Sequence, residues 1–198
     1  PTFRKENNLE EKPIVAILPG SRKQEITKML SVMLGVVDDF TDYQFVIAGA
    51  PSQDYDLYEP FLKSKNVHFI ANKTYDLLCH STAALVTSGT ATLETALFKV
   101  PEVVCYKGSS ISYQIAKRLL TIKYISLVNL IMDKFVVKEL IQNELTVENL
   151  QKELALILTD NQRIAEIKTD YAALKKLLSQ GGDASAKAAK SIYDFTIL

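Results

Sequence analysis

The chain has 198 residues, enough for one large α/β domain or two small ones, and its 47% hydrophobic content excludes wholesale disorder. Lys plus Arg balances Asp plus Glu at 23 each, so the basic excess that a broad nucleic-acid interface needs is absent and we expect no nucleic-acid partner. No apolar run reaches the roughly 20 residues of a membrane-spanning helix.

The few cysteines and histidines give no metal signature. Cys79 and Cys105 lack CxxC spacing, and we expect both to be buried free thiols in a reducing compartment. His68 and His80 do not have the spacing of metal ligands. The sequence therefore predicts neither a metal nor a cofactor.

Short apolar runs of buried-strand type alternate with helical patterns along most of the chain. The predicted strands are 14–18, 43–48, 67–70, 83–86 and 102–106. Helices are expected at 22–40, 54–64, 74–80, from 90 onward, at 109–120, 146–158, 160–178 and 184–195. Residues 122–130 are interpreted as a strand or an irregular crossing, and 136–142 as a loop or short turn. Residues 1–12 are polar and without a period, as in a linker.

This alternation predicts an α/β fold, a Rossmann-like parallel sheet of about five strands with helices on both faces and right-handed crossovers. Ligands bind such sheets beyond the carboxyl ends of the strands. The turns at 19–22, 49–50, 88–90 and 107–108 all follow predicted strands. We therefore expect these turns to share one crevice.

The turn after the fourth predicted strand has the composition of a phosphate and sugar site. Ser88 is a candidate N-cap, and Gly89 permits a sharp turn and close approach of a ligand. Thr90 and Glu94 are four residues apart and share one face of the helix that follows. Free N–H groups at a helix start suit phosphate, and a carboxylate accepts two hydrogen bonds from a sugar diol. An ordinary turn with a surface glutamate is the alternative.

The first predicted helix begins with two cations. Ser21 and Gln24 match a capping box, which places Arg22 and Lys23 in the first helical turn. The helix dipole disfavours a cation there by roughly 0.3–1 kcal/mol. A solvated surface tolerates this arrangement, but an anion bound at the turn explains it better.

Several nucleotide motifs are missing from the sequence. It has no GxxxxGK[ST], no GxGxxG after the first predicted strand and no GxSxG. These absences disfavour a P-loop enzyme, a dinucleotide oxidoreductase and an α/β-hydrolase. The remaining expectation is a site for a phosphorylated ligand.

Five segments, in order and spacing, resemble the lipid-A-disaccharide synthase family. They are 17–26, 87–94, 104–107, 126–129 and 136–142. The resemblance implies a GT-B glycosyltransferase, in which two Rossmann-like domains face each other and the C-terminal one binds the nucleotide sugar. It implies that 1–12 is a linker from a missing N-terminal domain, 13–180 the nucleotide-sugar-binding domain, and 181–198 a C-terminal helix that packs toward the missing domain.

The resemblance also implies a reaction. UDP-2,3-diacylglucosamine would donate its sugar to 2,3-diacylglucosamine 1-phosphate, with inversion and without a metal. The general base would belong to the missing domain, so the fragment alone is expected to be inactive. The acylated substrates imply a cytoplasmic location, peripheral to the inner membrane. Residues 117–125 mix cations with apolar residues and are a candidate membrane contact, although a helix end packed on the core is the simpler interpretation.

Roles for individual residues follow from the matching motifs. Gly20 and Ser21 would pass close to the phosphates, and Arg22 would stabilise the departing diphosphate. The phosphates would be capped by Ser88, Gly89, Thr90 and Thr92, Glu94 would bind the ribose, Lys107 could reach phosphate, and the sugar side of the cleft would be lined by Asn129, Glu139 and Gln142.

Each of the weaker assignments has a plain alternative. Thr92 could be a solvent-side helix residue, Lys107 a solvated lysine, and the last three could stabilise loops. The family pattern has proline where Val128 and Lys138 stand, which makes the roles of Asn129 and Glu139 less secure. Two other functions stay open: another UDP-sugar enzyme, either a GT-B transferase or a UDP-GlcNAc 2-epimerase, and a non-catalytic Rossmann-like binding module.

Overall fold

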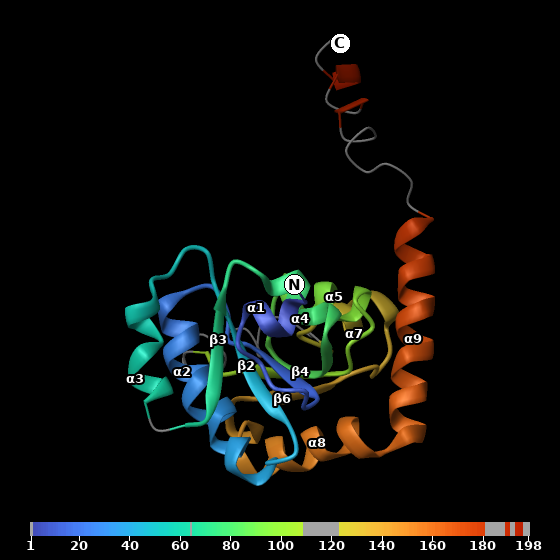
Figure 1. Cartoon of the computed structure of the whole chain (residues 1–198). Helices are drawn as coiled ribbons and strands as arrows, with labels where there is room; N and C mark the ends of the chain where they lie inside the picture. The colour runs from blue at the N-terminus through green and yellow to red at the C-terminus, as the bar shows by residue number, and fades with distance from the viewer. Residues whose placement is uncertain (1, 64, 109–122, 181–188, 191–192, 196–198) are drawn as a thin grey trace.

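The computed structural model describes residues 2–63, 65–108, 123–180, 189–190 and 193–195 (Figure 1). Six parallel strands form one sheet in the order β3-β2-β1-β4-β5-β6. They are β1 (Ile14–Leu18), β2 (Gln44–Gly49), β3 (Val67–Ala71), β4 (Ser81–Thr87), β5 (Glu102–Tyr106) and β6 (Lys138–Ile141). The predicted α/β class with a parallel sheet is confirmed.

Helices pack on the sheet because its central strands are apolar on both faces. On β1, Val15 and Ile17 belong to one hydrophobic cluster, whereas Ile14, Ala16 and Leu18 belong to another. The first cluster includes residues of α2 (Lys23–Met33), η1 (Leu34–Asp39), α8 (Val147–Thr159) and α9 (Asn161–Ser179). The second includes residues of α1 (Phe3–Glu6) and α4 (Thr74–Cys79). The remaining described helices are η2 (Tyr55–Leu57), α3 (Glu59–Leu62), α5 (Thr90–Leu97), α7 (Leu127–Met132) and η3 (Gln142–Glu144).

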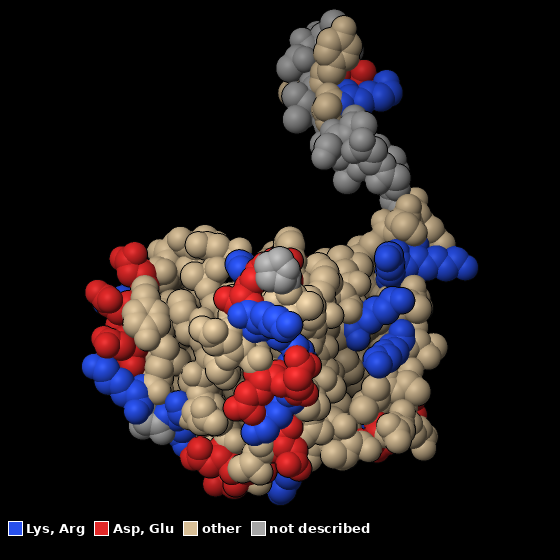
Figure 2. All heavy atoms as spheres, viewed as in Figure 1, with Lys and Arg blue, Asp and Glu red and all other residues tan. Residues whose placement is uncertain are grey.

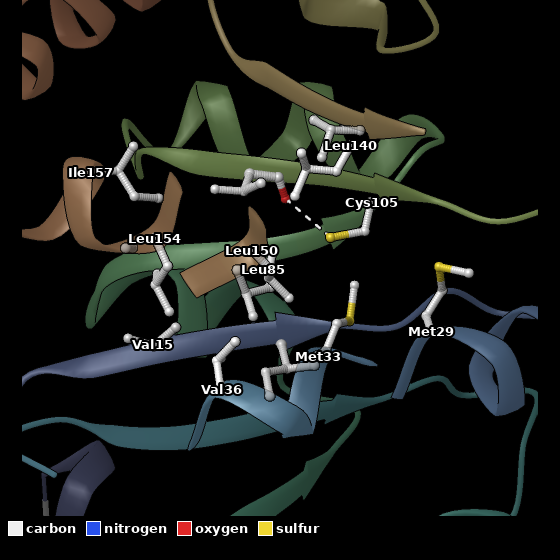
Figure 3. Packing of buried hydrophobic residues seen from close by; sticks show 14 of the residues in the cluster. Val15, Met29, Met33, Val36, Leu85, Cys105, Leu140, Leu150, Leu154 and Ile157 are labelled. Carbon is white, nitrogen blue, oxygen red and sulfur yellow. Dashed lines mark hydrogen bonds between the residues drawn. The ribbon is translucent and has the colours of Figure 1, made fainter. Parts of the chain in front are cut away.

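Two elements after β5 differ from the sequence-based expectation. Residues 127–132 form α7 rather than a strand or crossing, and the Ser126 hydroxyl caps this helix by accepting from the Asn129 N–H at 3.2 Å. Residues 138–141 form β6 rather than a loop, and pair with β5 in parallel. In Figure 3, Leu140 of β6 lies in the core beside Cys105 of β5. The predicted helices at 109–120 and 184–195 lie outside or largely outside the described residues.

The segment expected to be a linker is fastened to the domain. The Gln44 side chain accepts from the Glu10 N–H at 3.0 Å and donates to the carbonyls of Glu10 and Lys12 at 2.6 Å each. The Phe3 ring stacks on His80 with 4.6 Å between centroids. Residues 3–12 therefore belong to the packed structure.

The remaining global expectations concern thiols, metals, charge and membranes. Cys105 is buried as predicted, but Cys79 is exposed at the end of α4, so that expectation was wrong. Within the described part of the chain, no helix has both the length and the hydrophobicity to cross a membrane, and no three His, Cys, Asp or Glu residues are grouped to hold a metal. Acidic and basic side chains are intermixed on the face seen in Figure 2.

A carboxyl group buried in the core makes stability depend on pH. Glu102 is fully buried at the start of β5, where its Oε1 accepts from the Tyr171 hydroxyl at 3.5 Å and its Oε2 has no hydrogen-bond partner in the part of the chain that the structure describes. Burial raises the pKa of Glu102 well above 4.5, and the Tyr171 hydrogen bond offsets this only partly. Because the folded-state pKa exceeds the unfolded one, the folded state binds more protons between the two values, and the free energy of unfolding falls as pH rises through that window.

We expect Glu102→Gln to remove this slope, because a neutral amide still accepts from Tyr171 and does not ionise. Urea midpoints of the parent and the variant, measured from pH 5 to pH 8, would test the prediction. Glu144→Gln, on an exposed residue, is the matched control. An equal decline with pH in parent and Glu102→Gln would show that Glu102 is not its source.

Candidate functional site

A cavity of about 520 Å³ opens beyond the carboxyl ends of β1, β2 and β4. It lies where the strand order reverses between β1 and β4, the position at which open α/β sheets bind ligands. Seven of the twelve predicted site residues line it: Gly20, Ser21, Arg22, Ser88, Gly89, Thr90 and Glu94. The expected crevice is therefore present for these residues, whereas Thr92, Lys107, Asn129, Glu139 and Gln142 do not line it.

The turn after β1 requires glycine. Gly20 has φ +104°, and a Cβ there would meet Oε2 of Glu25 at 2.8 Å. The turn is also tied to the loop after β2, because Nε2 of Gln53 donates to the Ser21 carbonyl at 3.1 Å. The backbone of Gly20 and Ser21 thus forms a fixed wall of the cavity.

Arg22 is not in the first helical turn, as the sequence suggested, but is the N-cap of α2. The capping residue is Glu25 rather than Gln24: its Oε2 accepts from the Arg22 N–H at 3.4 Å, and its Oε1 accepts from the Arg22 guanidinium at 2.7 Å. This ion pair explains the position of Arg22 without a ligand. The Arg22 side chain is 80% exposed, however, and exposed ion pairs contribute little to stability. The guanidinium can therefore exchange Glu25 for a bound anion at small cost.

The turn after β4 also differs from its predicted capping. Gly89, not Ser88, is the N-cap of α5, and the Ser88 hydroxyl donates to the Ile125 carbonyl at 2.9 Å. Thr92 is fully buried, and its hydroxyl donates to the Gly89 carbonyl at 2.8 Å, so it is neither a solvent-side residue nor exposed to the cavity. Gly89 has φ 160°, an extended backbone, and a Cβ there would meet nothing within 4 Å. The predicted sharp turn is present, because the chain bends at Ser88 and Gly89 between β4 and α5, and the approach to the N-terminus of α5 is open.

Glu94 is the carboxylate in this cavity without an internal partner. Glu94 lines the cavity one helical turn after Thr90, and its carboxylate makes no hydrogen bond or ion pair with any described residue. Glu25 lines the cavity too, but it is occupied by Arg22. Both oxygens of Glu94 can therefore accept from one ligand carrying two hydroxyl groups.

Asn129 and Glu139 form a buried network away from the cavity. Oδ1 of Asn129 accepts from the N–H groups of Val136 and Val137 at 2.9 Å each, and its Nδ2 donates to Oε1 of Glu139 at 2.8 Å. The Glu139 carboxylate accepts from the N–H groups of Ile125 and Ser126 at 3.0 and 2.9 Å. Asn129 and Glu139 therefore stabilise loops, as the alternative interpretation held, and they do not line the first cavity.

The network reaches the first cavity indirectly. It fixes Ile125, whose carbonyl accepts the Ser88 hydroxyl at the wall of the cavity. Gln142, at φ +53°, has a buried Nε2 to which no described residue is hydrogen-bonded. Lys107 lines a different cavity, described below.

Other residues of the cavity were not predicted as site residues. Thr74, at the start of α4, and Pro51, after β2, form its far wall, and Thr87 ends β4. Thr87 is recognisable in the sequence only as a polar residue closing an apolar strand. Nothing in the local sequence marks Thr74, because it arrives through the packing of α4.

Comparisons with known proteins show to which family the chain belongs. The family model described as Lipid-A-disaccharide synthetase matches residues 2–193. The chain belongs to the lipid-A-disaccharide synthase family. It is 36% identical over 194 residues to a lipid-A-disaccharide synthase of Syntrophus aciditrophicus, a match that covers 92% of this chain and 50% of that protein. It thus spans about half the length of this relative, and the predicted family resemblance is confirmed.

Solved structures support the fold of this family. The calicheamicin glycosyltransferase CalG4 superposes with a TM-score of 0.58 at 17% identity, over 92% of this chain and 42% of that one. The spinosyn rhamnosyltransferase SpnG, solved with thymidine diphosphate, gives a TM-score of 0.55 at 15% identity, over 83% and 42%. At these identities the likeness shows a GT-B type of fold, as predicted.

The two glycines of the cavity should respond differently to the same change. Gly20→Ala puts a Cβ on a backbone with φ +104° and against Glu25, so we expect a loss of about 1–3 kcal/mol in unfolding free energy. Gly89→Ala meets open space and should stay within about 0.5 kcal/mol. Urea unfolding of both variants tests this, and equal losses would contradict the backbone geometry.

The Asn129 network should be a large contributor to stability. Asn129→Ala removes the hydrogen-bond partner of two buried N–H groups and of one carboxylate oxygen. Each buried group left without a partner lowers the free energy of unfolding by about 1–3 kcal/mol. We expect a clear drop in the urea midpoint. Asn143→Ala, the same change on an exposed residue of η3, is the control. A midpoint for Asn129→Ala equal to that of the control would rule out the network as a stabilising element.

Proposed function

We propose that this chain is the donor-binding part of a glycosyltransferase that uses UDP-2,3-diacylglucosamine and 2,3-diacylglucosamine 1-phosphate and forms the lipid A disaccharide 1-phosphate and UDP. Family membership supports the choice of substrates. The observation that carries the binding role is the first cavity, which places Arg22 and an unpaired Glu94 around the start of α5.

The groups in this cavity suit the two parts of a nucleoside diphosphate. The N–H groups at the start of α5 have no intrahelical partners and carry the positive end of the helix dipole, which suits phosphate. Glu94, a turn further along, is placed to accept from the ribose hydroxyls. The volume of about 520 Å³ is in the range of small-ligand sites.

We propose that the reaction inverts the anomeric centre and needs no metal. The acceptor hydroxyl attacks the anomeric carbon, the bond to the diphosphate breaks, and UDP leaves with the electron pair. The growing negative charge would be stabilised by Arg22, released from Glu25, and by the helix start at Gly89. The general base would lie in the part of the protein outside this chain, so the isolated chain would bind donor without turnover.

The acylated substrates also suggest where the protein works. Both would be held in a membrane by their acyl chains, so we propose that the whole enzyme acts in the cytoplasm, in peripheral contact with the inner membrane. Of the candidate contact segment 117–125, only Lys123, Tyr124 and Ile125 are described. Tyr124 is buried, which fits the packed alternative for this end of the segment.

Calorimetric titration with UDP in EDTA tests the binding role. We expect the parent to bind, and Glu94→Gln to weaken binding by about tenfold or more, because hydrogen bonds to a charged acceptor are worth about 1.5–3 kcal/mol. Arg22→Ala should weaken UDP binding severalfold. Glu144→Gln, an exposed carboxylate outside the cavity, should bind UDP as the parent does.

Three results would count against the proposal. Unchanged affinity in Glu94→Gln would remove the ribose role. Failure of the folded parent to bind UDP would favour a non-catalytic module. With the full-length protein, epimerisation of UDP-GlcNAc in place of sugar transfer would favour the other UDP-sugar enzyme.

A further inference from the structure

A second cavity of about 390 Å³ adjoins the first, between the start of α2 and the end of β5. Its lining includes Arg22, Lys23, Lys28, Thr87, Tyr106 and Lys107. Arg22, Glu25 and Thr87 line both cavities. A ligand in one cavity therefore lies directly beside a ligand in the other.

The second cavity carries an excess of positive charge. Lys23 and Lys28 come from α2, Lys107 follows β5, and none of the three ammonium groups forms an ion pair or hydrogen bond with any described residue. Glu25, the single carboxylate among the described residues of the lining, is bonded to Arg22 at 2.7 Å. Three uncompensated ammonium groups around one concave surface attract an anion of more than one charge.

Thr87 provides an independent sign of a ligand. It is 5% exposed, and its Oγ1, in the wall that the two cavities share, is buried without a hydrogen-bond partner among the described residues. An unsatisfied buried hydroxyl is uncommon in folded proteins and calls for a partner such as a ligand. Because no hydrogen bond fixes the rotamer of Thr87, rotation about χ1 can turn the hydroxyl toward an oxygen atom in the cavity.

We propose that the second cavity is a subsite for a phosphomonoester dianion, occupied together with the nucleotide in the first cavity. A phosphomonoester carries close to two charges at neutral pH and three acceptor oxygens, which match three lysines and one hydroxyl donor. The cavity is larger than a phosphate group, so it can also admit part of the sugar that bears it.

The position of this subsite separates it from the phosphates of the nucleotide. The start of α5, at Gly89 and Thr90, lines only the first cavity, whereas Lys23, Lys28 and Lys107 line only the second. The identity of the ligand rests on the proposed function, in which it is the phosphate of the sugar 1-phosphate acceptor. Lys107 then binds the acceptor rather than the donor.

Titration of the isotope-labelled chain with glucose 1-phosphate, followed by amide chemical shifts at fixed ionic strength, tests the subsite. We expect shifts at Lys23, Lys107 and Gly108, binding that persists with saturating UDP, and no such shifts with glucose. Lys107→Ala and Lys28→Ala should each weaken glucose 1-phosphate at least threefold and leave UDP affinity unchanged. Lys168→Ala, an exposed lysine of α9, is the control and should alter neither.

Thr87→Val separates a ligand contact from a structural role. The change is nearly isosteric and removes the unsatisfied hydroxyl, so we expect an equal or higher urea midpoint together with weaker binding of glucose 1-phosphate. Unchanged affinity in both Thr87→Val and Lys107→Ala would overturn the subsite.

The same titrations distinguish the two proposals. Displacement of glucose 1-phosphate by UDP would mean that the anion site belongs to the nucleotide, which overturns the subsite and leaves the proposed function standing. Binding of glucose 1-phosphate at the second cavity by a folded chain that does not bind UDP would support the subsite and count against the proposed function. Absence of glucose 1-phosphate binding, with UDP bound, also overturns the subsite.

Discussion

The reversal of strand order between β1 and β4 is the constraint on which the site depends. These strands pair in parallel, with Leu18 opposite Val86, so their carboxyl ends lie side by side. The chain leaves β1 toward α2 and β4 toward α5, and the space between the two turns is the first cavity. Apolar strands buried on both faces hold this geometry, since a shift of one residue in β1 would exchange residues between the two hydrophobic clusters.

A buried carboxylate extends this constraint to the other edge of the sheet. Glu139 of β6 accepts two backbone N–H groups and one from Asn129, so its charge is compensated by donors rather than by a cation. A network this fully satisfied has one low-energy arrangement, which fixes Ile125 and, through it, Ser88 at the cavity wall. The family motifs around Asn129 and Glu139 thus support the site from behind without lining it.

The sequence predicted the sheet and the position of the first cavity because both follow from local patterns: apolar runs, and turns at their ends. It missed β6 because Val136–Gln142 mixes polar and apolar residues, and its pairing with β5 is a tertiary contact. It displaced the cap of α2 by one residue because Ser21–Gln24 matches the capping pattern, whereas Arg22 is the N-cap in the structure and Glu25, at N3, accepts from its N–H. The burial of Thr92 and Asn129 also depends on packing that no local pattern contains.

Arg22 is the group through which the two cavities can communicate. It lines both of them, and its exposed pair with Glu25 is weak enough to open for a stronger anion. Glu25 would remain in place, because it also accepts from the Arg22 N–H as part of the helix cap. A guanidinium presents a planar fork of five donors and can bridge two anions, which a lysine ammonium does less well. Under the proposed function, a diphosphate on one side and a phosphomonoester on the other would therefore both draw on Arg22, and the charge that favours departure of UDP would be set partly by whether the acceptor is bound.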